Sequence, residues 1–300
     1  MKKKTYLFAL MTMALTLGSC SNNEDGIGGE TSKFITVSTS IGNMTRVATD
    51  AKGGQTFEEG DEISVYAWTG DATIAPDASE RVVNNAINKL TSSSWVSTPQ
   101  MLWKNNRDKH YFIGVYPTAA ISDLSAGEYT FDANKQTEND LLVAVNPDGL
   151  SYSADAQQTV PLTFTHVMAK LAVNLTYKNQ WGGIPTVEKV VVGNAAKEAT
   201  INYLTKVVTP STTAKEDFSL PEITENTKYV SVIIPQEEVK QLTIVIGGKN
   251  FVYDNGTPFK LESGKITTVN LEVGRDEIKL GDVKITDWED GSTFSGEAIN

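Results

Sequence analysis

Short stretches in which apolar and polar residues alternate recur along almost the whole chain. Ile35, Val37 and Ile41 fall on one side of an early stretch, and Leu171 and Val173 fall on one side of a later one. A period of two places successive side chains on opposite faces of a β-strand, so each stretch is predicted to be a strand with one buried face. The stretches return at intervals of roughly 8 to 12 residues with Gly, Asn, Asp or Pro between them, which is typical of β-sandwiches. The sequence therefore predicts an all-β protein.

One segment departs from this pattern. Val83, Ala86, Ile87 and Leu90 have the spacing of one helix face, and Asp77 and Glu80 ahead of them have the spacing of a capping box. Taken alone, residues 77–90 predict a helix.

The first twenty residues have the parts of a lipoprotein leader. Lys2–Lys4 are basic, Tyr6–Leu17 carry no charge, and Leu17-Gly18-Ser19-Cys20 resembles a bacterial lipobox. These twelve uncharged residues are too few to cross a bilayer as a helix, which takes roughly 20. An ordinary signal peptide with a chance cysteine is the alternative, but Cys20 is the only cysteine in the chain. We therefore expect residues 1–19 to be removed and Cys20 to be acylated, which would anchor the protein to outer-membrane lipid.

The composition limits the partners and the domain organisation of the residues after the leader. Residues 21–300 carry 23 basic and 37 acidic side chains, and an acidic surface repels nucleic-acid phosphates, so we expect no nucleic-acid partner. Without a second cysteine no disulfide can form within the chain, and stability must come from packing. About 280 residues suggest two domains. The polar spacer 21–26 is either a solvated linker or a tract that sorts the protein to the cell surface, and its residues do not separate the two.

The sequence contains no strong pattern of catalytic or metal-binding residues. Its two histidines, His110 and His166, lie at the edges of strand-like segments, where packing or hydrogen bonding is the simpler role. The acidic runs at 58–62 and 287–290 contain carboxylate pairs, but charge runs at turns are usually solvated. We expect no enzymatic activity, no metal site and no cofactor. The five tryptophans could form a sugar-binding platform if exposed, although tryptophan in a strand is more often part of a core.

Several loose motifs, in order along the chain, resemble the fimbrillin-like proteins of Bacteroides and Porphyromonas, which are subunits and accessory proteins of type V pili. The motifs are the lipobox, Thr45-Arg46, Phe57-x-x-Gly60-Asp61-x-Ile63-x-Val65-Tyr66, Trp95 with Trp103, His110-Tyr111-Phe112 with Tyr116-Pro117, Phe164-x-His166-x-x-Ala169-Lys170-Leu171, and Ile285-x-x-Trp288-x-x-Gly291.

The resemblance implies two transthyretin-like β-sandwich domains in tandem. These would span residues 47–164 and 165–300, after a lipidated linker and first strand at 20–46. It also places Arg81 to Leu90 in a strand rather than a helix, and we follow the resemblance there.

The resemblance further implies assembly by strand exchange. An arginine-specific protease would cut after Arg46, before Val47, and release the strand Phe34 to Ile41. A terminal strand of another fimbrial subunit would then fill the groove, with ladder hydrogen bonds giving strength and alternating side chains giving register. The donor would come from the tail, Glu277 to Ile299. The donor-strand side chains would be Ile278, Leu280, Val283 and Ile285, and Gly281 interrupts their alternation, which leaves open the half that is donated.

Two functions of different kinds follow. The first is a structural or adhesive component of a fimbrium on the outer surface, which also contacts a host or bacterial receptor or glycan. The second is a surface lipoprotein that binds glycans and does not polymerise.

Overall fold

The computed structural model describes residues 33–42, 56–136, 138–153, 158–254 and 256–288. Within them the chain forms nineteen strands and one turn of 3-10 helix, Asn179–Trp181 (η1). The prediction of an all-β protein is therefore confirmed. Cys20, Arg46 and Val47 lie outside the described residues.

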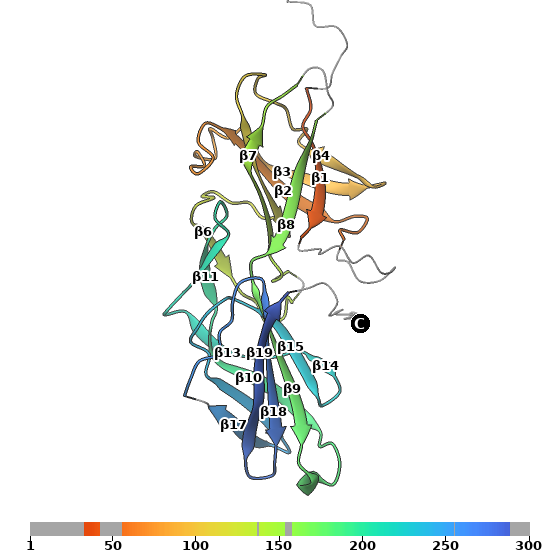
Figure 1. Cartoon of the computed structure of the whole chain (residues 1–300), viewed down its shortest axis with the longest axis vertical. Helices are drawn as coiled ribbons and strands as arrows, with labels where there is room; N and C mark the ends of the chain where they lie inside the picture. The colour runs from red at the N-terminus through yellow and green to blue at the C-terminus, as the bar shows by residue number, and fades with distance from the viewer. Residues whose placement is uncertain (1–32, 43–55, 137, 154–157, 255, 289–300) are drawn as a thin grey trace, which may run out of the picture.

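A seven-stranded sheet occupies the upper half of the molecule (Figure 1). Its strand order is β1-β8-β7-β5-β2-β3-β4. The strands are β1 (Thr36–Ile41), β2 (Glu62–Thr69), β3 (Val83–Thr91), β4 (Ser94–Thr98), β5 (His110–Tyr116), β7 (Leu142–Leu150) and β8 (Thr159–His166).

Two further sheets lie in the lower half (Figure 1). The five-stranded sheet has the order β14-β15-β9-β18-β19, and the four-stranded sheet has the order β13-β10-β16-β17. The strands are β9 (Ala169–Tyr177), β10 (Val187–Ala196), β13 (Lys215–Ser219), β14 (Glu222–Thr224), β15 (Lys228–Ile233), β16 (Gln241–Ile246), β17 (Lys249–Asp254), β18 (Lys265–Val273) and β19 (Ile278–Asp287).

A small third sheet joins the halves. In it β6 (Gly127–Thr130) from the first half pairs with β11 (Glu198–Asn202), which pairs in turn with β12 (Val207–Pro210). The loop after β6 adds a second connection, because the Gln136 Oε1 atom accepts the backbone N–H of Val232 on β15 at 2.9 Å.

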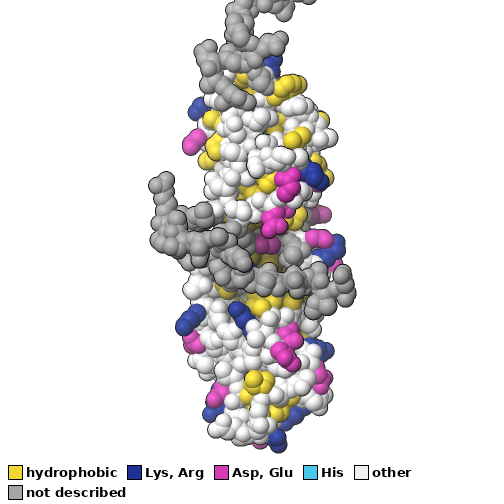
Figure 2. All heavy atoms as spheres, turned by 90° about the vertical axis from the view of Figure 1, so that its right-hand side faces the viewer, with side chains coloured by type: hydrophobic (Ala, Val, Ile, Leu, Met, Phe, Trp, Pro, Cys, Tyr) yellow, Lys and Arg dark blue, Asp and Glu magenta, His cyan; other side chains and the backbone are white. Residues whose placement is uncertain are grey.

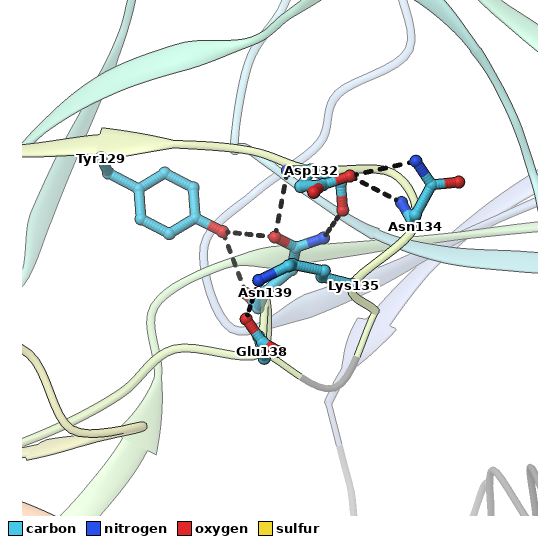
Figure 3. A network of polar contacts seen from close by, with 6 residues as sticks. All are labelled: Tyr129, Asp132, Asn134, Lys135, Glu138 and Asn139. Carbon is cyan, nitrogen blue, oxygen red and sulfur yellow. Dashed lines mark hydrogen bonds and ion pairs between the residues drawn. The ribbon is translucent and has the colours of Figure 1, made fainter. Parts of the chain in front are cut away.

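Buried Asn139 shapes that loop (Figure 3). Its Oδ1 accepts the Tyr129 hydroxyl at 3.1 Å and its Nδ2 donates to the Asp132 carbonyl at 2.6 Å, while Lys135 and Glu138 form an ion pair at the loop's surface. The buried amide is thus satisfied, as buried polar groups generally are. This network holds Gln136 in place against β15.

The helix predicted over residues 77–90 is wrong, and the strand implied by the family resemblance is confirmed as β3. The register of β2 with β3 shifts between Val65 and Ala67, so Asn84 and Asn85 together oppose Tyr66. Asn85 has a φ of 57°, which is the geometry of a bulge. Because of the extra residue, the inward-facing Val83 and Ala86 lie three apart, which imitates helical spacing.

The apolar interior forms two clusters. The larger runs without interruption from one face of the seven-stranded sheet, through Tyr66 and Ile113, into the lower half. The smaller covers the other face of that sheet and includes Phe112, Leu162 and the inward side chains of β1. The upper sheet is therefore buried on both faces at β2 and β5.

Candidate functional site

β1 is the edge strand of the seven-stranded sheet. It pairs in parallel with β8 over six register positions, from Thr36 opposite Thr159 to Ile41 opposite Phe164. Ile35, Val37 and Ile41 point into the smaller cluster and are 1%, 6% and 8% exposed. The alternation predicted for this strand is confirmed. The other buried members of this core lie on β2, on β3 or later in the chain, from Met101 onward.

The outer edge of β1 is held at one end. The Ile35 N–H donates to the Met101 carbonyl at 3.0 Å, and the Trp103 N–H donates to the Lys33 carbonyl at 3.1 Å. Phe34 and Leu102 form an antiparallel bridge between these two bonds. From Thr36 onward β1 diverges from β4, and the described residues form no backbone ladder between the two strands. One side-chain bond crosses the gap, from the Trp95 Nε1–H to Thr39 Oγ1 at 3.1 Å.

The divergence opens a cleft of about 890 Å³ between β1 and β4. One wall is formed by β1 and the following Gly42, and the other by Leu90, Ser94 and Trp95. The described residues that line it carry no charged side chain. Figure 2 shows this side of the molecule, where the visible upper part is mostly white and yellow, with a few charged side chains among them.

Phe57 closes one end of the cleft. Its ring makes edge-to-face contacts with the rings of Trp95, Tyr116 and Phe164, at centroid distances of 5.3, 5.4 and 5.1 Å. Such aromatic pairs stabilise beyond their buried area. Because Phe164 is the ladder partner of Ile41, this cluster lies directly under the C-terminal end of β1.

The four apolar tail residues all lie on β19, the edge strand of the five-stranded sheet. Their ladder partners on β18 alternate: Ile278 opposite Val273, Leu280 opposite Leu271, and Val283 opposite Val269. A bulge places both Gly281 and Asp282 opposite Asn270 and so restores the phase. All four apolar side chains therefore share one face, which the interrupted alternation of the sequence did not show.

The two halves of that face differ in burial. Ile278 and Leu280 pack against the larger cluster, whereas Val283 and Ile285 are 39% and 40% exposed. The half of the tail that could meet a partner without first leaving its own core is therefore the one with Val283 and Ile285.

Trp288 fixes the end of β19 to the junction between the upper and lower halves. Its indole stacks on the His166 imidazole with centroids 4.1 Å apart and planes 7° from parallel, and the Lys170 Nζ lies 4.1 Å from its ring centroid. The His166 Nδ1 also bonds Asp140 Oδ1 at 2.7 Å. Two motifs separated by more than a hundred residues thus meet in one cluster, a contact that neither motif predicts alone.

The expected structural role of the histidines fits what the described residues show. His110 is fully buried; its Nε2 accepts the Lys104 N–H at 3.0 Å, and burial lowers its pKa. The described residues contain no group of three or more His, Cys, Asp or Glu side chains that could hold a metal ion. The acidic run at 58–62 builds turns instead: Asp61 accepts the Glu58 N–H at 2.7 Å, and Glu59 accepts the Ser92 N–H.

The tryptophans do not form the in-line platform that exposed rings would give. Trp68, Trp103 and Trp288 are buried, and Trp95 and Trp181 are half-buried. In the part of the chain that the structure describes, no helix is long and apolar enough to cross a membrane.

A family model described as fimbrillin-like matches residues 45–288. Among solved structures, a candidate cell adhesion protein from Bacteroides uniformis is 18% identical with a TM-score of 0.64, over 86% of this chain and all of that one. A candidate cell adhesion protein from Bacteroides ovatus is 18% identical with a TM-score of 0.62, over 85% of this chain and 98% of that one.

The tip fimbrial protein Mfa3 from Porphyromonas gingivalis, with a C-terminal truncation, is 12% identical with a TM-score of 0.51, over 77% of this chain and 95% of that one. At these identities the likeness shows a shared fold. No curated protein matches the sequence.

Proposed function

Because the chain belongs to the fimbrillin-like family, we propose that it is a structural or adhesive component of type V fimbriae that assembles by strand exchange. Its leader, residues 1–19, is removed, acylated Cys20 anchors it in the outer membrane facing outward, and residues 47–164 and 165–300 act as two transthyretin-like domains. Cleavage after Arg46 separates β1 from the body that starts at Val47. A terminal strand of another subunit then takes the place of β1.

The observation that carries this proposal is the position of β1. It is an edge strand, yet its Val37 and Ile41, together with Ile35 just before it, are buried in a core built by the strands that follow. Removing it leaves an apolar groove beside the unpaired edge of β8, and such an edge is a template for another strand. A replacement must present apolar side chains at alternate positions to fill the places of Ile35, Val37 and Ile41.

The tail meets that requirement. β19 places Ile278, Leu280, Val283 and Ile285 on one face and Lys279, Asp282 and Lys284 on the other, while Asp287, at the end of the strand, lies on the apolar face. Two of the four are already partly exposed. The tail of one subunit therefore presents the apolar side chains on one face that the groove of the next requires.

The distribution of arginines supports a single processing cut. The chain has four arginines, at 46, 81, 107 and 275. Arg81 is buried and donates to Pro76, Asn84, Ile121 and Ser122. Arg107 lies in a turn held by Asn105, and Arg275 in the β18–β19 connection, where its guanidinium lies over the Trp181 ring. Short, bonded turns resist the local unfolding that proteolysis needs.

Limited digestion with an arginine-specific protease tests the proposal. We expect one early product that begins at Val47, followed by a ladder of assemblies on gels that collapses on heating. Arg46→Lys should abolish both product and ladder, and the matched Arg107→Lys should change neither. Assembly that proceeds equally well in Arg46→Lys would refute processing at this site.

The second candidate is a lipoprotein that keeps β1 and binds a glycan. It is favoured by the cleft, whose described lining is uncharged and includes serine and threonine hydroxyls and Trp95. A monomer that retains residues 34–41 in cells and binds polysaccharide would establish it in place of the first.

A further inference from the structure

We propose that the cleft between β1 and β4 is the entry point for the tail strand of a second subunit, and that β1 is displaced from its Ile41 end toward its Ile35 end. This inference rests on the proposed function. It adds a direction to the exchange and assigns an interaction surface to the cleft.

The two ends of β1 are held unequally. Next to Ile35 the chain is bonded on both sides, to β8 through the ladder and to residues 101–103 through two backbone bonds. Among the described residues, the backbone between Thr39 and Ile41 is bonded to β8 alone, and the Trp95 indole bonds Thr39 across the gap. Detaching β1 from its neighbours therefore breaks fewer interactions per residue at the Ile41 end than at the Ile35 end. The proposed cut after Arg46 would free the chain at this same end, five residues beyond Ile41.

The cleft offers an incoming strand both kinds of contact that strand addition uses. Half of the backbone groups of β1 point toward the cleft, and β4 pairs with β3 through one edge and presents its other edge. Phe57, Leu90 and Trp95 supply apolar surface at the walls. An extended segment can thus form backbone bonds and place an apolar side chain before any residue of β1 has left.

The tail strand of a second subunit fits this surface. The described residues that line the cleft are uncharged, and the apolar face of β19 is uncharged from Ile278 to Ile285, with Asp287 at its end. Lys279, Asp282 and Lys284 fall on the opposite face of the strand. Val283 and Ile285 are the apolar side chains already exposed on that strand. They can enter the cleft first while Ile278 and Leu280 remain packed in their own subunit.

Two matched disulfide staples test the direction. Thr36 and Thr159 are ladder partners with their hydroxyl oxygens 3.3 Å apart, and Ser40 and Thr163 are ladder partners with theirs 3.2 Å apart. Neighbouring strands are about 4.8 Å apart, within the reach of a disulfide. In a Cys20→Ser background, the pairs T36C/T159C and S40C/T163C therefore close the two ends of β1 separately.

The probe is a fluorescent synthetic peptide with the sequence of residues 275–300, added to protein already cut after Arg46. Binding is followed by anisotropy, and release of the β1 fragment by mass spectrometry. Without a staple we expect binding and release. With the 36–159 staple we expect peptide binding at a similar initial rate while β1 is retained. With the 40–163 staple we expect initial binding to slow at least tenfold, and reduction should restore it.

The results separate the alternatives. If the 36–159 staple slows initial binding as much as the 40–163 staple, the direction is overturned. If the unstapled, cut protein neither binds the peptide nor releases β1, the proposed function itself fails. If a neutral oligosaccharide, and not the peptide, protects Trp95 from oxidation, the cleft is a saccharide site and the inference is overturned.

A second variant keeps the test independent of the staples. Trp95→Phe removes the bond to Thr39 and retains an aromatic ring, and we expect peptide entry to quicken roughly 2- to 10-fold, the effect of one net hydrogen bond. The matched Trp181→Phe, in the lower half, should leave the rate unchanged. An unchanged or slower rate in Trp95→Phe would contradict the role of the cleft.

Discussion

Shortening one inward side chain of β1 should weaken the strand's hold far more than changing its outward neighbour. Ile35 is fully buried in the smaller cluster, so Ile35→Ala removes several methyl and methylene groups worth about 0.8 kcal/mol each and leaves a cavity. Substitutions of this kind cost about 2–5 kcal/mol. Thr36→Ala at the next position, on the outward face, is the matched control and should cost about 1 kcal/mol or less.

The effect can be measured before and after processing. In the uncut protein, a loss of about 3 kcal/mol lowers the urea midpoint of the upper half by roughly 1–3 M, given common slopes of 1–3 kcal/mol per M. In protein cut after Arg46, β1 is held by non-covalent contacts alone. A loss of at least about 2 kcal/mol should then weaken its retention roughly 30-fold or more.

The comparison of the two variants decides the matter. If burial of alternate side chains holds β1, Ile35→Ala releases the fragment quickly and Thr36→Ala behaves like the unchanged protein. Equal effects of the two substitutions would refute the reasoning, because β1 would then be held by its backbone hydrogen bonds with no contribution from the burial of its inward side chains.

Three further predictions follow from other parts of the structure. Leu280→Ala should lower the melting temperature, at a cost of about 1–3 kcal/mol, because Leu280 packs on its own core, whereas Ile285→Ser should leave melting nearly unchanged and reduce assembly measured by electron microscopy. Arg81→Leu should cost about 3 kcal/mol in urea unfolding, because carbonyls that the guanidinium now bonds lose their donor; a loss below 1 kcal/mol would contradict that role. Burial lowers the pKa of His110, so the stability that neutral His110 contributes is complete above about pH 6.5. That stability is lost as pH falls toward the folded pKa, by at most about 1.4 kcal/mol per pH unit. His110→Gln should flatten this part of the plot of stability against pH.

The sequence was sufficient for the strands whose pattern is unbroken. Ile35, Val37 and Ile41 keep a period of two, and the structure places all three inward. The alternation of apolar and polar residues is a local property of the sequence, and a regular strand places successive side chains on opposite faces.

Bulges explain where that pattern misled. At Asn85 the extra residue made β3 look helical, and at Gly281 it made the tail look as though its apolar face were broken. A bulge is defined by two strands facing each other, so the identity of the partner strand is needed to recognise it. The family resemblance corrected the first case, and the ladder with β18 resolved the second.

The cleft was beyond the reach of sequence patterns for a related reason. It exists because β1 joins β8, more than a hundred residues later, and diverges from β4. Phe57 and Trp95 were visible as parts of loose motifs, but nothing local shows that they flank one opening. The stacking of Trp288 on His166 likewise depends on the meeting of two distant segments.

The most direct test of strand exchange is a photo-crosslink placed beside β1 in cells. A photoreactive amino acid at Thr163, on the outward face of β8 next to Ser40, reports which strand occupies the groove. In assembled material the account predicts crosslinks to the terminal strand of a second subunit, within the segment equivalent to residues 277–300. Crosslinks to residues 36–42 of the same chain throughout the assembled material would contradict it.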